Sequence, residues 1–307
     1  MITGKRPEGL RLLITLRGSI LRNIALPLAV IVIVSVAVTL AQGELLGLKL
    51  HMNVAVFGML GTVLAIILGF RTNASYDRYC EARRMWGELS AAIRALARAL
   101  EGQLDAPNFE ADTPERKALK HLIGLMHVLR HDLRGTEAGS DLVDWLEEAL
   151  RNTTLERRFP AAHVLDEVSR SINQMGREGR LSEFARVALQ QELTFIQRQL
   201  SGCERLKTTP IPFAYSLLVH RTISVYLMLL PFGVVDSCGG MTPVVSFMLA
   251  YTFFGLEAVG TQIEEPFGLL PNDLPLAALC RALEIDLAPL LGHPPPPPLT
   301  PIKGVLT

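Results

Sequence analysis

The chain contains 307 residues, of which 49% are hydrophobic and 20% are charged. Thirty Lys and Arg balance thirty Asp and Glu, so net charge gives no reason to expect a nucleic-acid partner. This composition is typical of a protein that is partly embedded in a membrane and partly in water. The four cysteines are scattered without a C-x-x-C pair, which predicts free thiols rather than a disulfide framework or a zinc site.

Four stretches lack Asp, Glu, Lys, Arg and His, and they cover residues 23–43, 52–70, 222–235 and 237–256. A helix of about 20 residues crosses the bilayer core, and three of these stretches reach that length alone. The third does so only by extending back past His220 and Arg221. A charge at the bilayer centre costs about 2.5–3.5 kcal/mol, so we expect this pair at or below the inner interface. The sequence thus predicts four transmembrane helices, and the first is too long for a cleaved signal peptide.

Basic residues flank the spans unevenly. They precede span one and follow span two, at Lys5, Arg6, Arg11, Arg17 and Arg22 and at Arg71, Arg78, Arg83 and Arg84. The loop at 43–51 holds only Lys49 as a strong base, and 236–241 holds none. The positive-inside bias therefore predicts a multi-pass protein of the cell (cytoplasmic) membrane with both termini cytoplasmic.

The predicted organisation follows from these spans. It consists of a cytosolic N-terminal segment (1–22), transmembrane helices one and two (23–70), a cytosolic helical region (71–210), transmembrane helices three and four (211–263) and a cytosolic C-terminal segment with a proline-rich tail (264–307). The tail at 293–298 is polyproline-like and is expected to be a solvated spacer.

The cytosolic region has helical periodicity. Apolar residues recur three and four apart at 74–103, 115–134, 140–151, 161–176 and 181–206. Asp112 or Thr113 is expected to cap a helix that begins at Pro114. No stretch alternates with period two, so no sheet is predicted and the fold class is all-α.

The second span carries a stripe formed by Thr62, Ile66 and Phe70, which are spaced four residues apart and lie on one face of a helix. The same helix continues past Arg71 into a charged segment. Three glycines, Gly58, Gly61 and Gly69, leave its other faces able to pack closely against neighbours. By spacing alone, helix packing is a more common role for such a stripe than lining a conduit.

Five short strings occur in register with the four predicted spans. They are Leu16-Arg17-Gly18-Ser19-Ile20, Leu68-Gly69-Phe70-Arg71-Thr72-Asn73, Arg158-Phe159-Pro160, Ile211-Pro212 and Glu265-Pro266-Phe267-Gly268. In this order and spacing they resemble the bestrophin family of ion channels, over roughly residues 8–285. The resemblance implies an all-α integral membrane protein that forms a homopentamer around one axial pore, with its own copies, membrane lipid and small monovalent ions as partners.

The resemblance also assigns pore residues. It implies that Thr62, Ile66 and Phe70 form the neck, where five copies of each apolar side chain would make a constriction that gates by dewetting. Thr62 departs from the bulky apolar residue that is frequent there in the family, which predicts a wetter outer end. A second, cytosolic constriction is implied at Ile211, just before the proline that opens span three.

Calcium binding is not expected. Eukaryotic relatives place an acidic cluster after Pro-Phe-Gly, and Ca²⁺ requires six to eight oxygen ligands. Here Leu269 and Leu270 occupy that position, which leaves only Gln262 and Asp273 as possible remnants of a calcium clasp. No metal and no cofactor are therefore predicted.

Ion preference stays open between cations and anions such as chloride. Glu264 and Glu265 are candidates for a cation-attracting ring at the inner mouth, although a solvated helix end is equally consistent with them. Glu257 lies near the inner end of an apolar span, where a carboxylate is a functional candidate or a partner of Arg221 or of a backbone donor. These carboxylates favour cations slightly.

Three histidines fall on one predicted helix, at His121, His127 and His131. The last two have the i, i+4 spacing that can bind zinc, but no H-E-x-x-H pattern accompanies them. We expect the three histidines to lie on a face of the helix that is exposed at the surface or in a vestibule.

Other functions remain as alternatives. No phosphate loop, nucleophile elbow or catalytic carboxylate pair occurs, so no enzyme is predicted. A membrane-anchored helical scaffold or sensor that binds a cytosolic partner would have the same spans with the second packed shut. A transporter would require broken helices, for which Pro212, Pro231 and Gly233 give only a hint.

Overall fold

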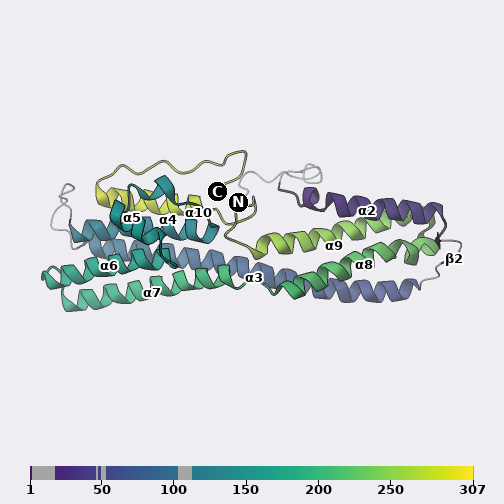
Figure 1. The fold of residues 1–307 in the computed structure, drawn as a ribbon, viewed down its shortest axis with the longest axis horizontal. Coiled ribbons are helices and arrows are strands. Elements are labelled where there is room, and N and C mark those ends of the chain that lie inside the picture. Colours follow the sequence, from purple (N-terminus) through teal and green to yellow (C-terminus); the bar gives the residue numbers. More distant parts are fainter. Residues whose placement is uncertain (2–17, 46–47, 50–52, 103–112, 307) are drawn as a thin grey trace. The chain divides into compact units, whose positions relative to one another are not determined.

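The computed structural model describes residues 1, 18–45, 48–49, 53–102 and 113–306, and the chain over these ranges is almost entirely helical (Figure 1). It divides into two compact units, which we call the span unit (Lys5–Tyr79 and Pro210–Glu265) and the charged unit (Met1–Gly4, Cys80–Thr209 and Pro266–Thr307). Most of the predicted N-terminal segment, with Leu16 and Arg17 of its string, and the possible cap Asp112 lie outside the described residues.

One helix confirms the continuity expected from the sequence. Helix α3 covers Val54–Glu101, a single helix of 48 residues that begins in the apolar run and ends in the charged segment. Its early part belongs to the span unit and its part from Cys80 onward to the charged unit.

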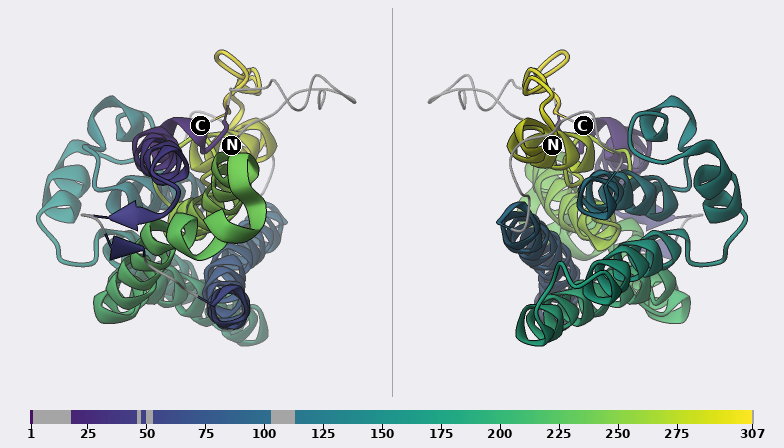
Figure 2. Two further views of the ribbon diagram at one scale, coloured as in Figure 1. Left: turned by 90° about the vertical axis from the view of Figure 1, so that its right-hand side faces the viewer. Right: turned by 90° about the vertical axis from the view of Figure 1, so that its left-hand side faces the viewer.

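The span unit packs four helical segments together: α2 (Leu21–Leu40), the first part of α3, α8 (Phe213–Cys238) and α9 (Thr242–Glu264). Its helices are seen nearly end-on in the left view of Figure 2. Aromatic rings fill the centre, where Tyr226 lies 5.9 Å from Phe57 and 5.7 Å from Phe253 between ring centroids. Gly233 is required beneath Phe57, because a Cβ at that position would lie 2.4 Å from the ring.

Among the residues that the structure describes, three helical stretches are long and apolar enough to cross a membrane, namely Leu21–Leu40, Val54–Glu101 and Phe213–Glu264. The last contains both α8 and α9, joined by the 3-10 turn Gly239–Met241, in which Gly239 has a φ of 50°. The two helices pack against each other and against α2 (Figure 1). At most half of each apolar window is buried within the chain, so half or more of the residues in each window are not buried. Outward-facing apolar residues on this scale indicate a lipid environment or a neighbouring protein.

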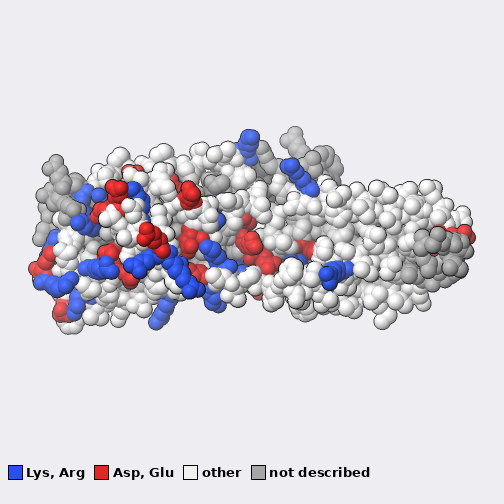
Figure 3. Space-filling model, viewed as in Figure 1, with Lys and Arg blue, Asp and Glu red and all other residues white. Residues whose placement is uncertain are grey.

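The charged unit surrounds the second part of α3 with shorter helices: α4 (Pro114–Arg134), η1 (Gly139–Leu142), α5 (Glu148–Leu155), α6 (Pro160–Arg177), α7 (Glu183–Thr208), α10 (Leu276–Leu287) and η3 (Ala288–Leu291). They are viewed nearly end-on in the right view of Figure 2. Thr113 caps α4 as predicted, with its hydroxyl accepting from the Arg116 N–H at 3.4 Å. Lys, Arg, Asp and Glu are frequent over this unit on the face drawn in Figure 3 and sparse over the span unit.

The structure corrects the predicted helix at 140–151. The chain instead forms η1, a short connection and α5, which begins only at Glu148. Leu142 and Leu146 have helical spacing, but they are buried as parts of a turn that packs against α4. Gly124 allows this close approach, since a Cβ there would lie 2.8 Å from Leu146. Tertiary packing therefore overrides the local pattern.

Two smaller expectations also fail. A minimal hairpin pairs β1 (Glu44–Leu45) with β2 (Leu48–Lys49), although no sheet was predicted. It is only two residues per strand, too short to show period two. The proline-rich tail at 293–298 is exposed at every position except Pro296, as expected of a solvated segment, but it is not a free spacer, because Pro294, Pro296 and Leu299 line a cavity of the charged unit.

Candidate ion pathway along helix α3

One face of α3 is fixed in the core of the span unit. Leu64 and Leu68 are buried there, and the hydroxyl of Tyr226 donates to the Phe57 carbonyl at 3.3 Å. Gly61 also belongs to this face, because a Cβ on it would lie 2.6 Å from the Tyr226 hydroxyl. The small residue thus permits close packing at this position.

The other two glycines of this span lie on open faces. A Cβ on Gly58 or on Gly69 would meet no atom of the chain within 4 Å. These two positions are therefore available for contacts outside the chain, in contrast to Gly61.

The predicted neck residues lie away from the core of the span unit. Thr62 is exposed, and the side chains of Ile66 and Phe70 are 54% and 69% exposed. They therefore contribute little to packing within one chain. Other apolar residues of the same helix, such as Met59 and Val63, are also exposed. Exposure therefore excludes a role in packing within the chain, but it does not by itself distinguish pore-lining residues from other outward-facing residues.

The hydroxyl of Thr62 is already used within its own helix. It donates to the Gly58 carbonyl at 2.9 Å. The donor is therefore satisfied, and the oxygen presents only acceptor capacity outward.

The exposed stripe continues beyond Phe70 with polar residues. Asn73 and Asp77 follow at helical spacing, and both are exposed. Asp77 forms no ion pair or hydrogen bond within the described residues. One face of α3 thus changes from apolar to acidic over about 10 Å, at 1.5 Å per residue.

The residue after Phe70 points the other way. The side chain of Arg71 is 3% exposed, and its Nη2 lies 3.6 Å from Glu264, 3.1 Å from the Thr261 hydroxyl and 3.4 Å from the Ser216 hydroxyl. Nε and Nη1 of Arg71 are buried without a partner. Sequence reasoning used Arg71 only as an orientation signal and missed this tie between α3, α8 and α9. Its i+3 spacing from buried Leu68 was the available clue.

Two of the three candidate carboxylates have partners. Glu264 is buried, pairs with Arg71 and accepts from the backbone N–H of Ile211 at 3.2 Å. Glu257 pairs with His220 at 2.8 Å, so its partner is neither Arg221 nor a backbone donor, the two partners considered from the sequence. Glu265 is exposed. Ile211 is partly exposed just before α8, and its role as a cytosolic constriction stays a prediction.

The possible calcium remnants belong to different units. Asp273 is buried and accepts from the Leu270 N–H at 2.7 Å, while Gln262 is half-buried. Over the described part of the chain, no group of three His, Cys, Asp or Glu side chains is placed to hold a metal ion.

The three histidines do not form a surface face, contrary to the expectation. His121 and His127 are buried and lie 3.0 and 2.5 Å from the carboxylates of Glu147 and Glu284. His131 lies 3.2 Å from Asp141. Each histidine thus has its own acidic partner inside the charged unit, because the segments that pack on α4 carry carboxylates, which a single-helix pattern cannot show.

All four cysteines are free thiols, as predicted. Burial raises the pKa of Cys203 to about 12, and burial likewise raises the pKa of Cys280 to about 12. Thiols of this kind are not nucleophiles at neutral pH.

Comparisons with known proteins agree with this architecture. The sequence profile described as Bacterial/Fungal Bestrophin protein matches residues 1–289. A protein from Mesorhizobium japonicum named voltage-dependent anion channel-forming protein is 38% identical over 297 residues, covering 96% of this chain and 94% of the relative. YneE of Escherichia coli strain K12, which bears the same name, is 36% identical over 287 residues and covers 94% and 93%.

A solved structure has the same fold. The crystal structure of a bacterial bestrophin homolog from Klebsiella pneumoniae superposes with a TM-score of 0.83 at 36% identity, covering 89% of this chain and 100% of that one. The chain therefore belongs to the bestrophin family. It is an almost entirely helical membrane protein of an ion-channel family and not an enzyme.

Proposed function

We propose that the protein is a homopentameric channel of the cytoplasmic membrane that passes small monovalent ions along the exposed face of α3. α8 and α9 act as separate spans, because their 26 and 23 residues correspond to about 39 and 35 Å of helix, more than the roughly 30 Å bilayer core. With α2 and α3 this gives four spans. The positive-inside bias supports cytoplasmic termini and a cytoplasmic charged unit.

The proposal rests on the difference between two faces of α3. Leu64, Leu68 and Arg71 hold one face in the span unit, and the stripe of Thr62, Ile66 and Phe70 is left without an intrachain role. Five-fold symmetry would bring five such stripes together. Rings of Ile66 and Phe70 would form a narrow apolar neck that conducts only when hydrated.

Charge along the stripe favours cations. Five copies of Asp77, which is unpaired among the described residues, would place carboxylates just beyond Phe70, and a ring of acidic side chains concentrates cations. Glu265 is the remaining candidate at the inner mouth, since Arg71 offsets the charge of Glu264. The relatives are named as anion channel-forming proteins, so the sign of the selectivity is the property that most needs measurement.

The neck is tested by conductance of purified protein in planar bilayers. We expect Ile66→Ala/Phe70→Ala to raise conductance severalfold, because smaller side chains widen and wet the constriction. Val63→Ala/Ile67→Ala removes apolar volume at the same depth on other faces and is the matched control. Equal conductance of the two double variants would refute the neck.

Selectivity is tested by the reversal potential in asymmetric NaCl. We expect the reversal potential to have the sign of a cation-selective channel and to be smaller in magnitude in Asp77→Asn. An anion-selective sign would overturn the role of Asp77 while leaving the neck in place.

The alternative of a membrane-anchored scaffold or sensor predicts a monomer or dimer in detergent, and the solution mass separates it from a pentamer.

A further inference from the structure

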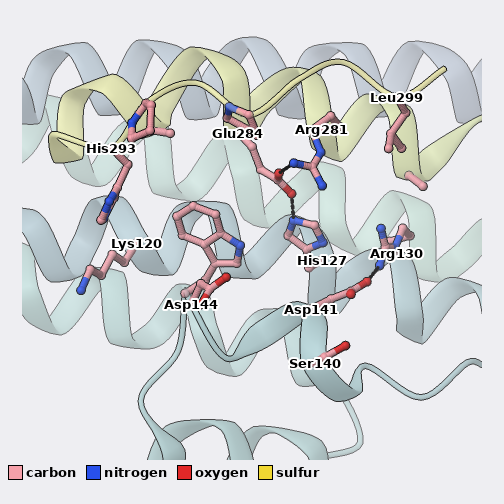
Figure 4. Close-up of a pocket in the computed structure, with 15 residues that line it drawn as sticks. Lys120, His127, Arg130, Ser140, Asp141, Asp144, Arg281, Glu284, His293 and Leu299 are labelled. Atoms are coloured by element: carbon pink, nitrogen blue, oxygen red, sulfur yellow. Dashed lines mark hydrogen bonds and ion pairs between the residues drawn. The ribbon is translucent and has the colours of Figure 1, made fainter.

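The charged unit contains a cavity of about 540 Å³, which is within the usual range for sites that bind small molecules. Its walls come from α4, from η1 and the connection after it, from α10, and from the proline-rich tail (Figure 4). Segments far apart in the sequence thus converge on one space. All of its lining residues belong to one unit, and none of them belongs to the stripe on α3.

Several charged groups of the wall already neutralise each other. Glu284 lies 2.5 Å from Nε2 of His127 and 3.0 Å from Nη1 of Arg281 (Figure 4). Arg130 pairs with Asp141 in the same wall. These pairs fix the wall, because Glu284 and His127 are both at least nine-tenths buried.

The groups that remain without partners are mostly hydrogen-bond donors. Lys120 forms no hydrogen bond or ion pair within the described residues, and the same holds for the side chain of His293. Nε of Arg281, whose N–H can only donate, is buried and unpartnered. Asp144 is the one wall carboxylate without a partner among the described residues. A buried donor without an acceptor is costly, so an acceptor-rich ligand would complement this wall.

The rest of the wall is apolar and aromatic. Trp145 lines the cavity together with Leu299 and two prolines of the tail. Prolines carry no N–H, so they offer a ligand only apolar surface and carbonyl oxygens. An indole and an ammonium group in the lining of one cavity suit a ligand with one charged end and one flat apolar end.

We propose that this cavity binds a small organic anion, with its carboxylate or phosphate at Lys120 and His293 and its apolar part against Trp145. This site is independent of the ion pathway. It would give the cytosolic side of the protein a receptor for an anionic metabolite.

Tryptophan fluorescence can report binding in this cavity. It has two tryptophans, of which Trp86 is fully buried and Trp145 lies in the cavity wall. The intact protein in detergent is titrated with phenyl phosphate and with benzoate, and indole fluorescence and calorimetry are followed. Saturable binding of either anion is expected, and the stronger of the two identifies the preferred charged group. Trp145→Phe should abolish the fluorescence change while calorimetric binding persists.

Matched probes and variants decide the outcome. Benzylamine tests the sign of the charge, and inorganic phosphate and benzyl alcohol test each half of the ligand separately. Lys120→Met should weaken the anion about tenfold or more, whereas Lys117→Met, one turn earlier on α4 and outside the wall, should leave the affinity within about twofold.

Lys120→Arg checks that folding is intact, since it keeps the charge and should retain most of the affinity. Equal or tighter binding of benzylamine would overturn the proposal. Absence of binding by both anions, or equal effects of the Lys120 and Lys117 variants, would overturn it as well.

Discussion

The two units of this chain treat charge in opposite ways. The span unit exposes apolar side chains and buries one strongly basic group, Arg71, with part of its guanidinium unpartnered. The charged unit exposes charge and also buries carboxylates beside a cation, such as Glu115, whose buried side chain lies 2.8 Å from the exposed Arg180. The difference shows that one part of the chain is suited to lipid and the other part to water. Lipid cannot satisfy a polar surface, whereas water can, so only the charged unit can cover itself with charge.

The largest effect expected from this difference is on the Glu115–Arg180 pair. The carboxylate of Glu115 is completely buried, so Arg180→Met would leave it uncompensated. We expect a loss of about 3 kcal/mol in the free energy of unfolding of the charged unit. Both tryptophans lie in this unit, so urea unfolding followed by indole fluorescence reports on it directly.

The exposed Arg177 offers a matched control at the end of α6, and Arg177→Met should change the free energy by no more than about 0.5 kcal/mol. The double variant Glu115→Gln/Arg180→Met should recover part of the stability. A single variant as stable as the natural chain would mean that Arg180 does not compensate the buried carboxylate of Glu115.

A smaller effect is expected for the buried arginine of the span unit. Arg71→Met leaves Glu264 without its cation, but it also removes two unpartnered nitrogens from the interior. The two contributions oppose each other, so we expect a loss of only about 1–2 kcal/mol. Thermal unfolding in detergent, followed by far-ultraviolet circular dichroism, measures it as a decrease of a few degrees. Arg71→Met/Glu264→Leu should restore the melting temperature, and a further decrease would show that the pair does not tie α3 to α9.

The smallest expected effect is a gradual loss of stability of the charged unit in acid. Burial raises the pKa of Asp141, but hydrogen bonds from Arg130 and His131 outweigh it and hold the pKa below 3.8. The pKa of Glu147 lies below 4.5 for the same reasons, with His121 as the donor. Burial and then the charge of Arg130 lower the pKa of His131 below 6.5.

In all three cases the unfolded chain binds the proton more readily than the folded chain, so stability rises with pH. The contribution of His131 is lost as the pH falls below about 6.5, and those of the carboxylates as it falls below about 4.5 and 3.8. The urea midpoint of the charged unit should therefore decrease on acidification. Asp141→Asn/Glu147→Gln should flatten this dependence in its acidic part, and an unchanged slope would exclude these pairs as its cause.

The sequence by itself determined the features that depend on local pattern. Apolar runs long enough for a bilayer predicted the spans, the stripe of Thr62, Ile66 and Phe70 predicted one face of one helix, and Thr113 with Pro114 predicted the start of α4. Short strings in register also placed the chain in its family, which the comparisons confirm. These inferences succeed because helix formation and membrane insertion depend on neighbours within a few residues.

Only the tertiary structure decided which side chains are buried and which residues contact each other between elements. It turned the first part of the predicted helix at 140–151 into a packed turn against Gly124, gave each histidine of α4 a carboxylate from another segment, and buried Arg71 directly after the exposed Phe70. It also folded the proline-rich tail over a cavity. Such contacts join residues far apart in the chain, and their energies come from desolvation and packing between elements, which no local pattern encodes.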